Sequence, residues 1–182
     1  MKKTVWTFGL VSGALVSAMM AVTIPFQDEA GFDHSLVVGY AAIVVSFLLI
    51  YFGVRSYRDK VGGGTVSFRR ALAVGSLIGL IASVCYVATW QVMYFNYMPN
   101  FLTEYGAREL EKARAEGASE AALAQQKAEL EDFERKYQNP AFNAAVTLME
   151  PLPVALLIAL VSAGTLSRKR RADLELGTAL RT

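Results

Sequence analysis

The sequence has little of what most catalytic and metal sites are built from. Its 182 residues include one cysteine, Cys85, and one histidine, His34. A single cysteine cannot form a disulfide within the chain, and a zinc site usually needs several cysteine or histidine ligands. Asp33 and Ser35 flank His34, but neighbours in sequence do not make a catalytic triad, so we expect this stretch to cap a helix. We therefore expect no metal, no cofactor and no enzyme activity.

The chain also lacks a marked excess of either charge. Its formal net charge is +2, which gives no reason to expect a nucleic-acid partner. Hydrophobic residues make up 54% of the chain and fall in long blocks. A helix of roughly 20 residues crosses a hydrocarbon core of about 30 Å. Four nearly uncharged blocks are near or above this length: Val5–Phe26, Leu36–Val54, Ala71–Tyr94 and Ala141–Ser167.

These blocks predict an all-α integral membrane bundle of four transmembrane helices in a lipid bilayer. We expect the helices at about residues 4–26, 35–54, 67–97 and 140–167, with a helical insertion at 98–139 and a basic tail at 168–182. The first apolar run is longer than the usual signal-peptide core of about 7–15 residues. We therefore favour a retained first helix, with a cleaved signal peptide as the alternative.

Basic residues are concentrated at one side of the predicted topology. Lys2 and Lys3 precede the first helix, four basic residues follow the fourth, and the first connection has acidic residues only. The second connection carries five basic residues, which we also expect to meet anionic lipid headgroups: Arg55, Arg58, Lys60, Arg69 and Arg70. Short basic segments stay in the cytoplasm. We therefore expect both termini in the cytoplasm, in a bacterial inner membrane.

The second connection contains three consecutive glycines, Gly62 to Gly64, followed by Thr65. A phosphate-binding loop has the pattern G-x-x-x-x-G-K-[ST] after a strand. The lysine and the spacing are missing here, and the stretch follows a predicted membrane helix. We interpret it as a connector, because glycine adopts positive φ and suits a turn.

Small residues recur every four positions in the first and third helices. The two rows are Gly9, Gly13 and Ser17 in the first helix, and Gly75, Gly79 and Ser83 in the third. Such rows lie on one helix face and allow two helix backbones to approach closely in lipid. We favour packing within the chain, and a homo-oligomer seam is the alternative.

The insertion is rich in strong helix formers. Gly117 interrupts it, Ser119 can cap a second helix, and Pro140 can start the next one. We expect a helical hairpin outside the membrane, with a single long helix as the alternative. Five residues at coiled-coil spacing could pack on the first arm or receive a partner protein: Leu123, Gln126, Leu130, Phe133 and Tyr137.

Glu150 is the carboxylate that lies inside an apolar block, and Pro151 and Pro153 follow it. Counting about 20 residues back from the basic edge places it near the outer rim of the bilayer. We expect an interfacial carboxylate at a kinked helix start. The alternative is a proton- or cation-coupled site in which Glu150 acts with Gln91 and Asn96.

Three stretches resemble a known family. They are RSYRDKVGGGTVSFRRALAVG, TWQVMYFNYMPNF and NPAFNAAVTLMEPLPVALLIALVSA. As a set they resemble the bacterial membrane-protein family called domain of unknown function DUF4199, over roughly Met1 to Leu166. The resemblance implies a four-helix inner-membrane protein and supplies no substrate, cofactor or catalytic residue.

The function expected from these observations is non-catalytic. We expect a membrane protein that acts by self-association, as a homo-oligomer, or by binding a membrane protein partner. The alternative is a small oligomeric solute or ion transporter that uses Glu150. A membrane enzyme is a third class, for which the sequence offers no catalytic pattern.

Overall fold

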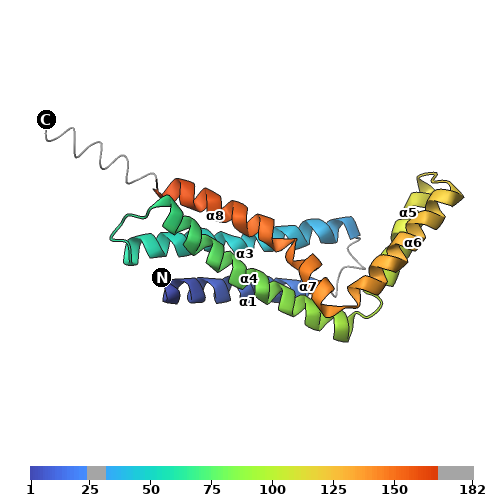
Figure 1. Ribbon diagram of the computed structural model, residues 1–182, viewed down its shortest axis with the longest axis horizontal. Helices are drawn as coiled ribbons and strands as arrows, with labels where there is room; N and C mark the ends of the chain where they lie inside the picture. Colours follow the sequence, from blue (N-terminus) through green and yellow to red (C-terminus); the bar gives the residue numbers. More distant parts are fainter. Residues whose placement is uncertain (24–31, 168–182) are drawn as a thin grey trace. The chain divides into compact units, whose positions relative to one another are not determined.

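A computed structural model describes residues 1–23 and 32–167, with side chains from residue 37 onward in the second range. The expected acidic first connection, the basic tail and the side chains of Asp33, His34 and Ser35 lie outside these residues. Every regular element in the described ranges is a helix (Figure 1). The helices are α1 (Lys2–Thr23), α3 (Phe32–Lys60), α4 (Phe68–Tyr97), α5 (Phe101–Ala115), α6 (Glu120–Tyr137), α7 (Pro140–Leu148) and α8 (Pro151–Ser167). The prediction of an all-α fold is confirmed.

Four helical segments are long and apolar enough to cross a membrane, as predicted. They are Lys2–Thr23, Val37–Lys60, Phe68–Tyr97 and Pro140–Ser167. Two of them differ in detail from the sequence-based expectation. Helix α3 continues to Lys60, beyond the expected end at Val54, because long basic side chains can stay in a helix and extend their charges toward water. The fourth span is divided into α7 and α8.

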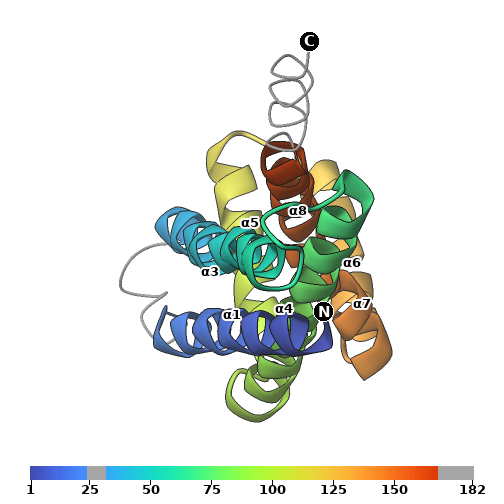
Figure 2. The same cartoon turned by 90° about the vertical axis from the view of Figure 1, so that its left-hand side faces the viewer.

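The chain forms two compact units, and the first comprises residues 1–89 and 148–182. Within it, α3 packs on both α1 and α8 (Figure 2). Apolar side chains from α1, α3, α4 and α8 form one core: Val16, Ile43, Phe47, Ile50, Val54, Val74, Ile78, Ala155 and Ala159. Many large apolar side chains instead point outward, among them Leu10, Val45, Leu48, Leu157 and Val161. An apolar exterior of this kind fits contact with lipid, because lipid tails are as apolar as leucine.

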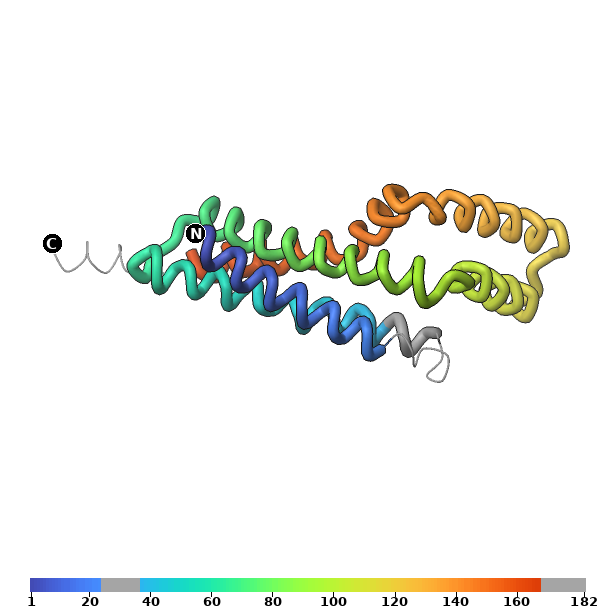
Figure 3. The backbone as a smooth tube through the Cα atoms, turned by 90° about the horizontal axis from the view of Figure 1, so that it is seen from below, coloured from blue at the N-terminus to red at the C-terminus, as the bar shows by residue number. Residues whose placement is uncertain are grey.

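Three parts of the first unit lie at one end of it. These are the N-terminal end of α1, the connection between α3 and α4, and the C-terminal end of α8 (Figures 1 and 3). The connection is a tight turn in which Gly62 N–H donates to Tyr57 O and Gly64 N–H donates to Arg58 O, both at 3.0 Å. Gly63 and Gly64 have φ of 61° and 88°, which other residues rarely adopt. The glycines thus close a turn between two helices, as the connector interpretation predicts.

The second unit comprises residues 90–147, and in it α5 and α6 run side by side (Figure 3). Helix α5 ends at Ala115, and Gly117 follows with a φ of 86°. Ser119 caps α6 as predicted, since its side-chain oxygen accepts a hydrogen bond from Ala122 N–H at 3.2 Å. Between the helices, Thr103 Oγ1 donates to Glu134 Oε1 at 2.6 Å.

The seam predicted on α6 makes contacts within this unit. Leu123 and Tyr137 are buried. A Cβ added to Gly106 in α5 would lie 3.6 Å from Leu130 Cδ1, so Leu130 packs against α5. The Phe133 ring centroid lies 5.3 Å from that of Tyr137 and 6.1 Å from that of Phe142 in α7. These contacts agree with the reading in which the seam packs on other parts of the same chain.

Candidate functional site

Glu150 lies in the two-residue break between α7 and α8. Helix α7 ends at Leu148, and Pro151 begins α8. Pro151 has no N–H group and a fixed φ, so it suits the first turn of a new helix and cannot continue the previous one. Glu150 therefore precedes the positive end of the α8 dipole, where a carboxylate is stabilised. Its side chain is exposed, and Tyr86 Oη in α4 donates a hydrogen bond to Glu150 Oε2 at 2.7 Å.

The depth of this pair follows from helix geometry. Tyr86 lies about 27 Å along α4 from Phe68, and α8 rises about 24 Å from Pro151 to Ser167. Both lengths approach the hydrocarbon thickness of about 30 Å. A bilayer with one face at the α3–α4 connection would therefore have its other face close to Glu150. This position supports an interfacial carboxylate rather than one at the bilayer midplane.

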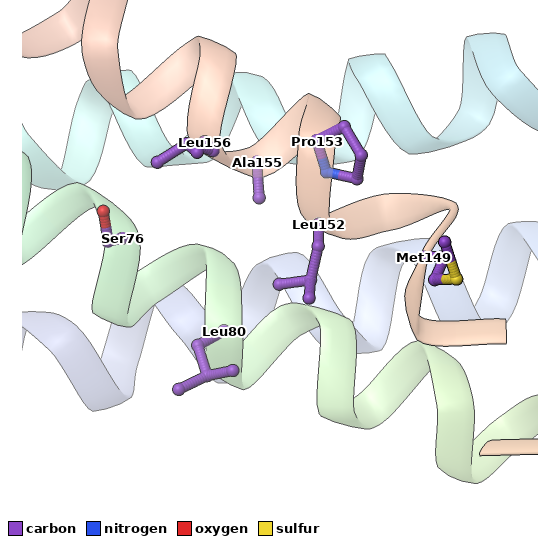
Figure 4. A pocket seen from close by; sticks show the side chains of 7 residues that line it. All are labelled: Ser76, Leu80, Met149, Leu152, Pro153, Ala155 and Leu156. Carbon is purple, nitrogen blue, oxygen red and sulfur yellow. The ribbon is translucent and has the colours of Figure 1, made fainter. Parts of the chain in front are cut away.

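An apolar groove of about 480 Å³ runs between α4 and α8 from the residue beside Glu150 (Figure 4). Its lining residues are Ser76, Leu80, Met149, Leu152, Pro153, Ala155 and Leu156. In Figure 4, Leu152 and Ala155 project from α8 toward the α4 segment that carries Leu80. Ser76 is the one side chain in this lining with a polar group, so the groove offers almost no hydrogen bonding to a ligand.

Gln91 and Asn96 belong to the second unit, whereas Glu150 belongs to the first, and each has partners in its own unit. Gln91 Nε2 donates to Pro140 O at 2.8 Å and to Asn143 Oδ1 at 3.3 Å, which fastens the start of α7 to α4. Asn96 Nδ2 donates to Val92 O of its own helix at 2.8 Å. Gln91 therefore acts as an interhelical tie, and Asn96 satisfies its amide locally.

A chain of hydrogen bonds surrounds Asn143, which the sequence pattern had not indicated as a site. Trp90 Nε1–H donates to Tyr137 Oη at 2.9 Å, and Tyr137 Oη is 3.0 Å from Thr147 Oγ1. Thr147 Oγ1 in turn donates to Asn143 Oδ1 at 3.5 Å. Asn143 is fully buried, and its Nδ2 has no acceptor among the described residues. Two polar residues four apart in an apolar block, Asn143 and Thr147, were the available signal, because that spacing puts them on one helix face.

The small-residue row of α1 faces α4. A Cβ added to Gly9 would lie 2.8 Å from Ile81 Cβ, and one added to Gly13 would lie 2.6 Å from Cys85 Cβ. Ser17 Oγ accepts a hydrogen bond from Thr89 Oγ1 at 2.7 Å. The row therefore serves close packing inside the chain, and Cys85 is one of the side chains it accommodates.

The row of α4 faces α8 and α3 instead. A Cβ added to Gly75 would lie 3.0 Å from Ala159 Cβ, and one added to Gly79 would lie 2.7 Å from Ala155 Cβ. Ser83 is fully buried, and its hydroxyl has no hydrogen-bond partner in the described part of the chain. Because these faces are covered by helices of the same chain, a homo-oligomer would need other surfaces.

Asp59 pairs with two of the basic residues around the α3–α4 connection. Arg58 Nε donates to Asp59 Oδ1 at 2.7 Å, and Arg55 Nε lies 3.7 Å from Asp59 Oδ2. Lys60, Arg69 and Arg70 have exposed side chains. Among the side chains of residues 1–23 and 37–167, no three His, Cys, Asp or Glu groups gather in a way that could hold a metal ion.

The sequence model of a family described as "Protein of unknown function (DUF4199)" matches residues 7–168. The chain belongs to this family. The match includes Glu150, the groove and both small-residue rows, and it confirms the predicted resemblance. No curated protein and no solved structure matches the DUF4199 chain. Its four apolar spans indicate a multi-pass membrane protein.

Proposed function

We propose that this DUF4199 protein is non-catalytic and acts by association, with the α5–α6 pair as the part that meets a protein partner or a second copy of the chain. The observation that carries the proposal is that this pair lies between two membrane spans in sequence and packs on itself. Leu123 is buried, and Leu130 lies against Gly106. Much of the apolar seam is thus used internally, and the exterior of the pair is mainly charged, with Phe133 36% exposed.

The charged exterior carries both signs in close alternation. Lys127 Nζ lies 3.8 Å from Glu131 Oε1, with 66% of each side chain exposed, and Arg135 is 78% exposed. Exposed ion pairs contribute little to stability. Charges of this kind influence the choice of partner and the rate of association more strongly, which supports a docking role for this surface.

The proposed membrane is a bacterial inner membrane, with both termini in the cytoplasm and α5–α6 on the opposite side. Its support is the positive charge near the end of the first unit that holds the α3–α4 connection. The test is thiol labelling of intact cells in a Cys85→Ala background. Ala124→Cys in α6 should react with a membrane-impermeant reagent, whereas Thr65→Cys should react only after permeabilisation. The reverse result would overturn this orientation.

Site-specific photo-cross-linking in native membranes tests the docking role. A photoreactive residue at Ala124 or Ala128, both exposed on α6, should give one discrete cross-linked species. The matched control is Val161, which is 56% exposed on α8 and faces the apolar exterior. Charge reversal by Lys127→Glu with Arg135→Glu should abolish the species without altering membrane insertion. The proposal fails if α6 gives no cross-linked species or if the charge reversal leaves it intact.

A small oligomeric solute or ion transporter that uses Glu150 is the second candidate. The observation that favours it is the Tyr86–Glu150 hydrogen bond of 2.7 Å beside a groove. A proton- or cation-coupled flux should then be lost in Glu150→Gln and reduced in Tyr86→Phe. Unchanged flux in Glu150→Gln would remove this candidate.

A further inference from the structure

We propose that the groove between α4 and α8, together with Glu150, binds a membrane lipid that carries a primary ammonium headgroup. One acyl chain of the lipid lies in the groove, and the ammonium group meets the Glu150 carboxylate. This inference goes beyond the association role of α5–α6, because its residues all belong to the first unit.

The lining of the groove fits an acyl chain. Six of the seven lining side chains are apolar, and the seventh is Ser76. The volume of about 480 Å³ is within the range of ligand sites, roughly 300–1,000 Å³. The groove is open to the outside of a helix bundle whose exterior is apolar, so the surrounding lipid reaches it directly. A polar soluble ligand would find almost no hydrogen-bonding partner along these walls.

The order of the groups along the helices matches the order of the groups in a lipid. Glu150 lies at the level where one face of the bilayer is expected, and Met149 begins the groove at that level. The deepest α4 residue of the lining, Ser76, is about 15 Å of helix rise away from Tyr86. A headgroup at Glu150 therefore places its chain along the groove toward the bilayer centre.

The charge of Glu150 selects the headgroup. A carboxylate accepts hydrogen bonds at about four lone-pair positions. Tyr86 uses one of them and orients the group, so Glu150 can also accept from an ammonium, which has three N–H donors. An anionic headgroup without an ammonium would be repelled. Phosphatidylethanolamine has the required chemistry, whereas phosphatidylglycerol does not.

Native mass spectrometry of the full chain in detergent tests the proposal, with equimolar dioleoyl phosphatidylethanolamine and phosphatidylglycerol. We expect the wild type to bind phosphatidylethanolamine about fivefold more tightly than phosphatidylglycerol. This ratio corresponds to the free energy of one favourable ion pair at a partly exposed site. Glu150→Gln should remove the preference, and Glu150→Lys should reverse it. Glu131→Gln on α6 is the matched control, because it neutralises an exposed carboxylate far from the groove in sequence and should keep the preference.

Substitutions that fill the groove test separately whether an acyl chain lies in it. Ser76→Phe should reduce binding of both lipids several-fold, and Ala73→Phe, one turn earlier on α4 and exposed outside the lining, should not. Equal binding of the two lipids by the wild type would overturn the headgroup assignment, as would a preference that persists in Glu150→Gln. Unchanged binding in Ser76→Phe would overturn the groove assignment. A dimer that forms only without bound lipid would mean that a second copy of the chain covers the groove instead.

Discussion

Replacement of Gly79 by alanine is the sharpest test of how the membrane helices pack. A Cβ at this position would lie 2.7 Å from Ala155 Cβ in α8 and 3.3 Å from Ile50 Cδ1 in α3. Nonbonded carbon atoms rest at about 3.5–4.0 Å, so α8 would have to move away from α4. We therefore expect Gly79→Ala to destabilise the protein, although alanine is the better helix former.

The expected magnitude combines two opposing effects. Overpacking of a well-packed core costs about 1–3 kcal/mol. Replacing glycine with alanine inside a helix gains about 0.5–1 kcal/mol. The net expected loss is about 0–2.5 kcal/mol of unfolding free energy. Gly164→Ala in α8 is the matched control, because nothing lies within 4 Å of its added Cβ, and it should stabilise by about 0.5–1 kcal/mol.

The assay is unfolding of the full chain in mixed micelles with rising SDS, followed by circular dichroism. The double variant Gly79→Ala with Ala155→Gly moves the methyl group from α8 to α4 at their contact. It should recover most of the lost unfolding free energy. We expect a coupling free energy of about 1–2 kcal/mol between the two positions. If Gly79→Ala behaves like Gly164→Ala, or if the double variant shows no coupling, α4 and α8 do not pack as described. A change of oligomeric state without a change of stability would instead assign the row to an interface between copies.

Three further predictions concern the α5–α6 pair. Ser119→Ala should cost about 1 kcal/mol and lower the thermal midpoint of the circular dichroism signal, because it removes the cap of α6, whereas Ser119→Asp should retain the cap. The hydrogen bond from Lys136 lowers the pKa of the Asp132 carboxyl below its usual 3.8. The contribution of this ion pair to folding stability is therefore present above pH 3.8 and is lost as the pH falls through the folded-state pKa. A carboxyl NMR titration should show this low pKa, and Lys136→Met should raise it. Burial, with a further contribution from Glu109, raises the pKa of the Tyr105 hydroxyl above 10.0, and ultraviolet titration against Tyr105→Phe should show it.

The sequence was sufficient to predict those parts of the fold that depend on local chemistry. Apolar length alone identified the four spans, since a helix that crosses lipid must satisfy its own backbone polar groups over about 20 residues. Ser119, Gly117 and Pro140 marked helix ends for reasons that need no knowledge of the tertiary structure.

The candidate site depended on contacts between residues far apart in the sequence. Glu150 could be singled out by its neighbours, but its partner Tyr86 lies 64 residues away in the chain. The packing partners of the two small-residue rows could not be predicted either. Spacing identifies the face of a helix but not the helix that packs against it. The spacing of Asn143 and Thr147 indicates a shared helix face, but their link to Trp90 and Gln91 depends on residues about 50 positions away in the sequence.

The pairing of α4 with α8 has a consequence for the order in which the protein is made. Synthesis proceeds from the N-terminus, so α1, α3 and α4 enter the membrane before the ribosome reaches Pro151. The glycine face of α4 then lacks its contacts with α8 while the polar α5–α6 segment is translated. Ile50 of α3 already lies beside Gly75 and Gly79, and the arrival of α8 adds the contacts of Ala159 and Ala155. A chain stalled or truncated before residue 150 would therefore lack the contacts of Ala155 and Ala159 with this face.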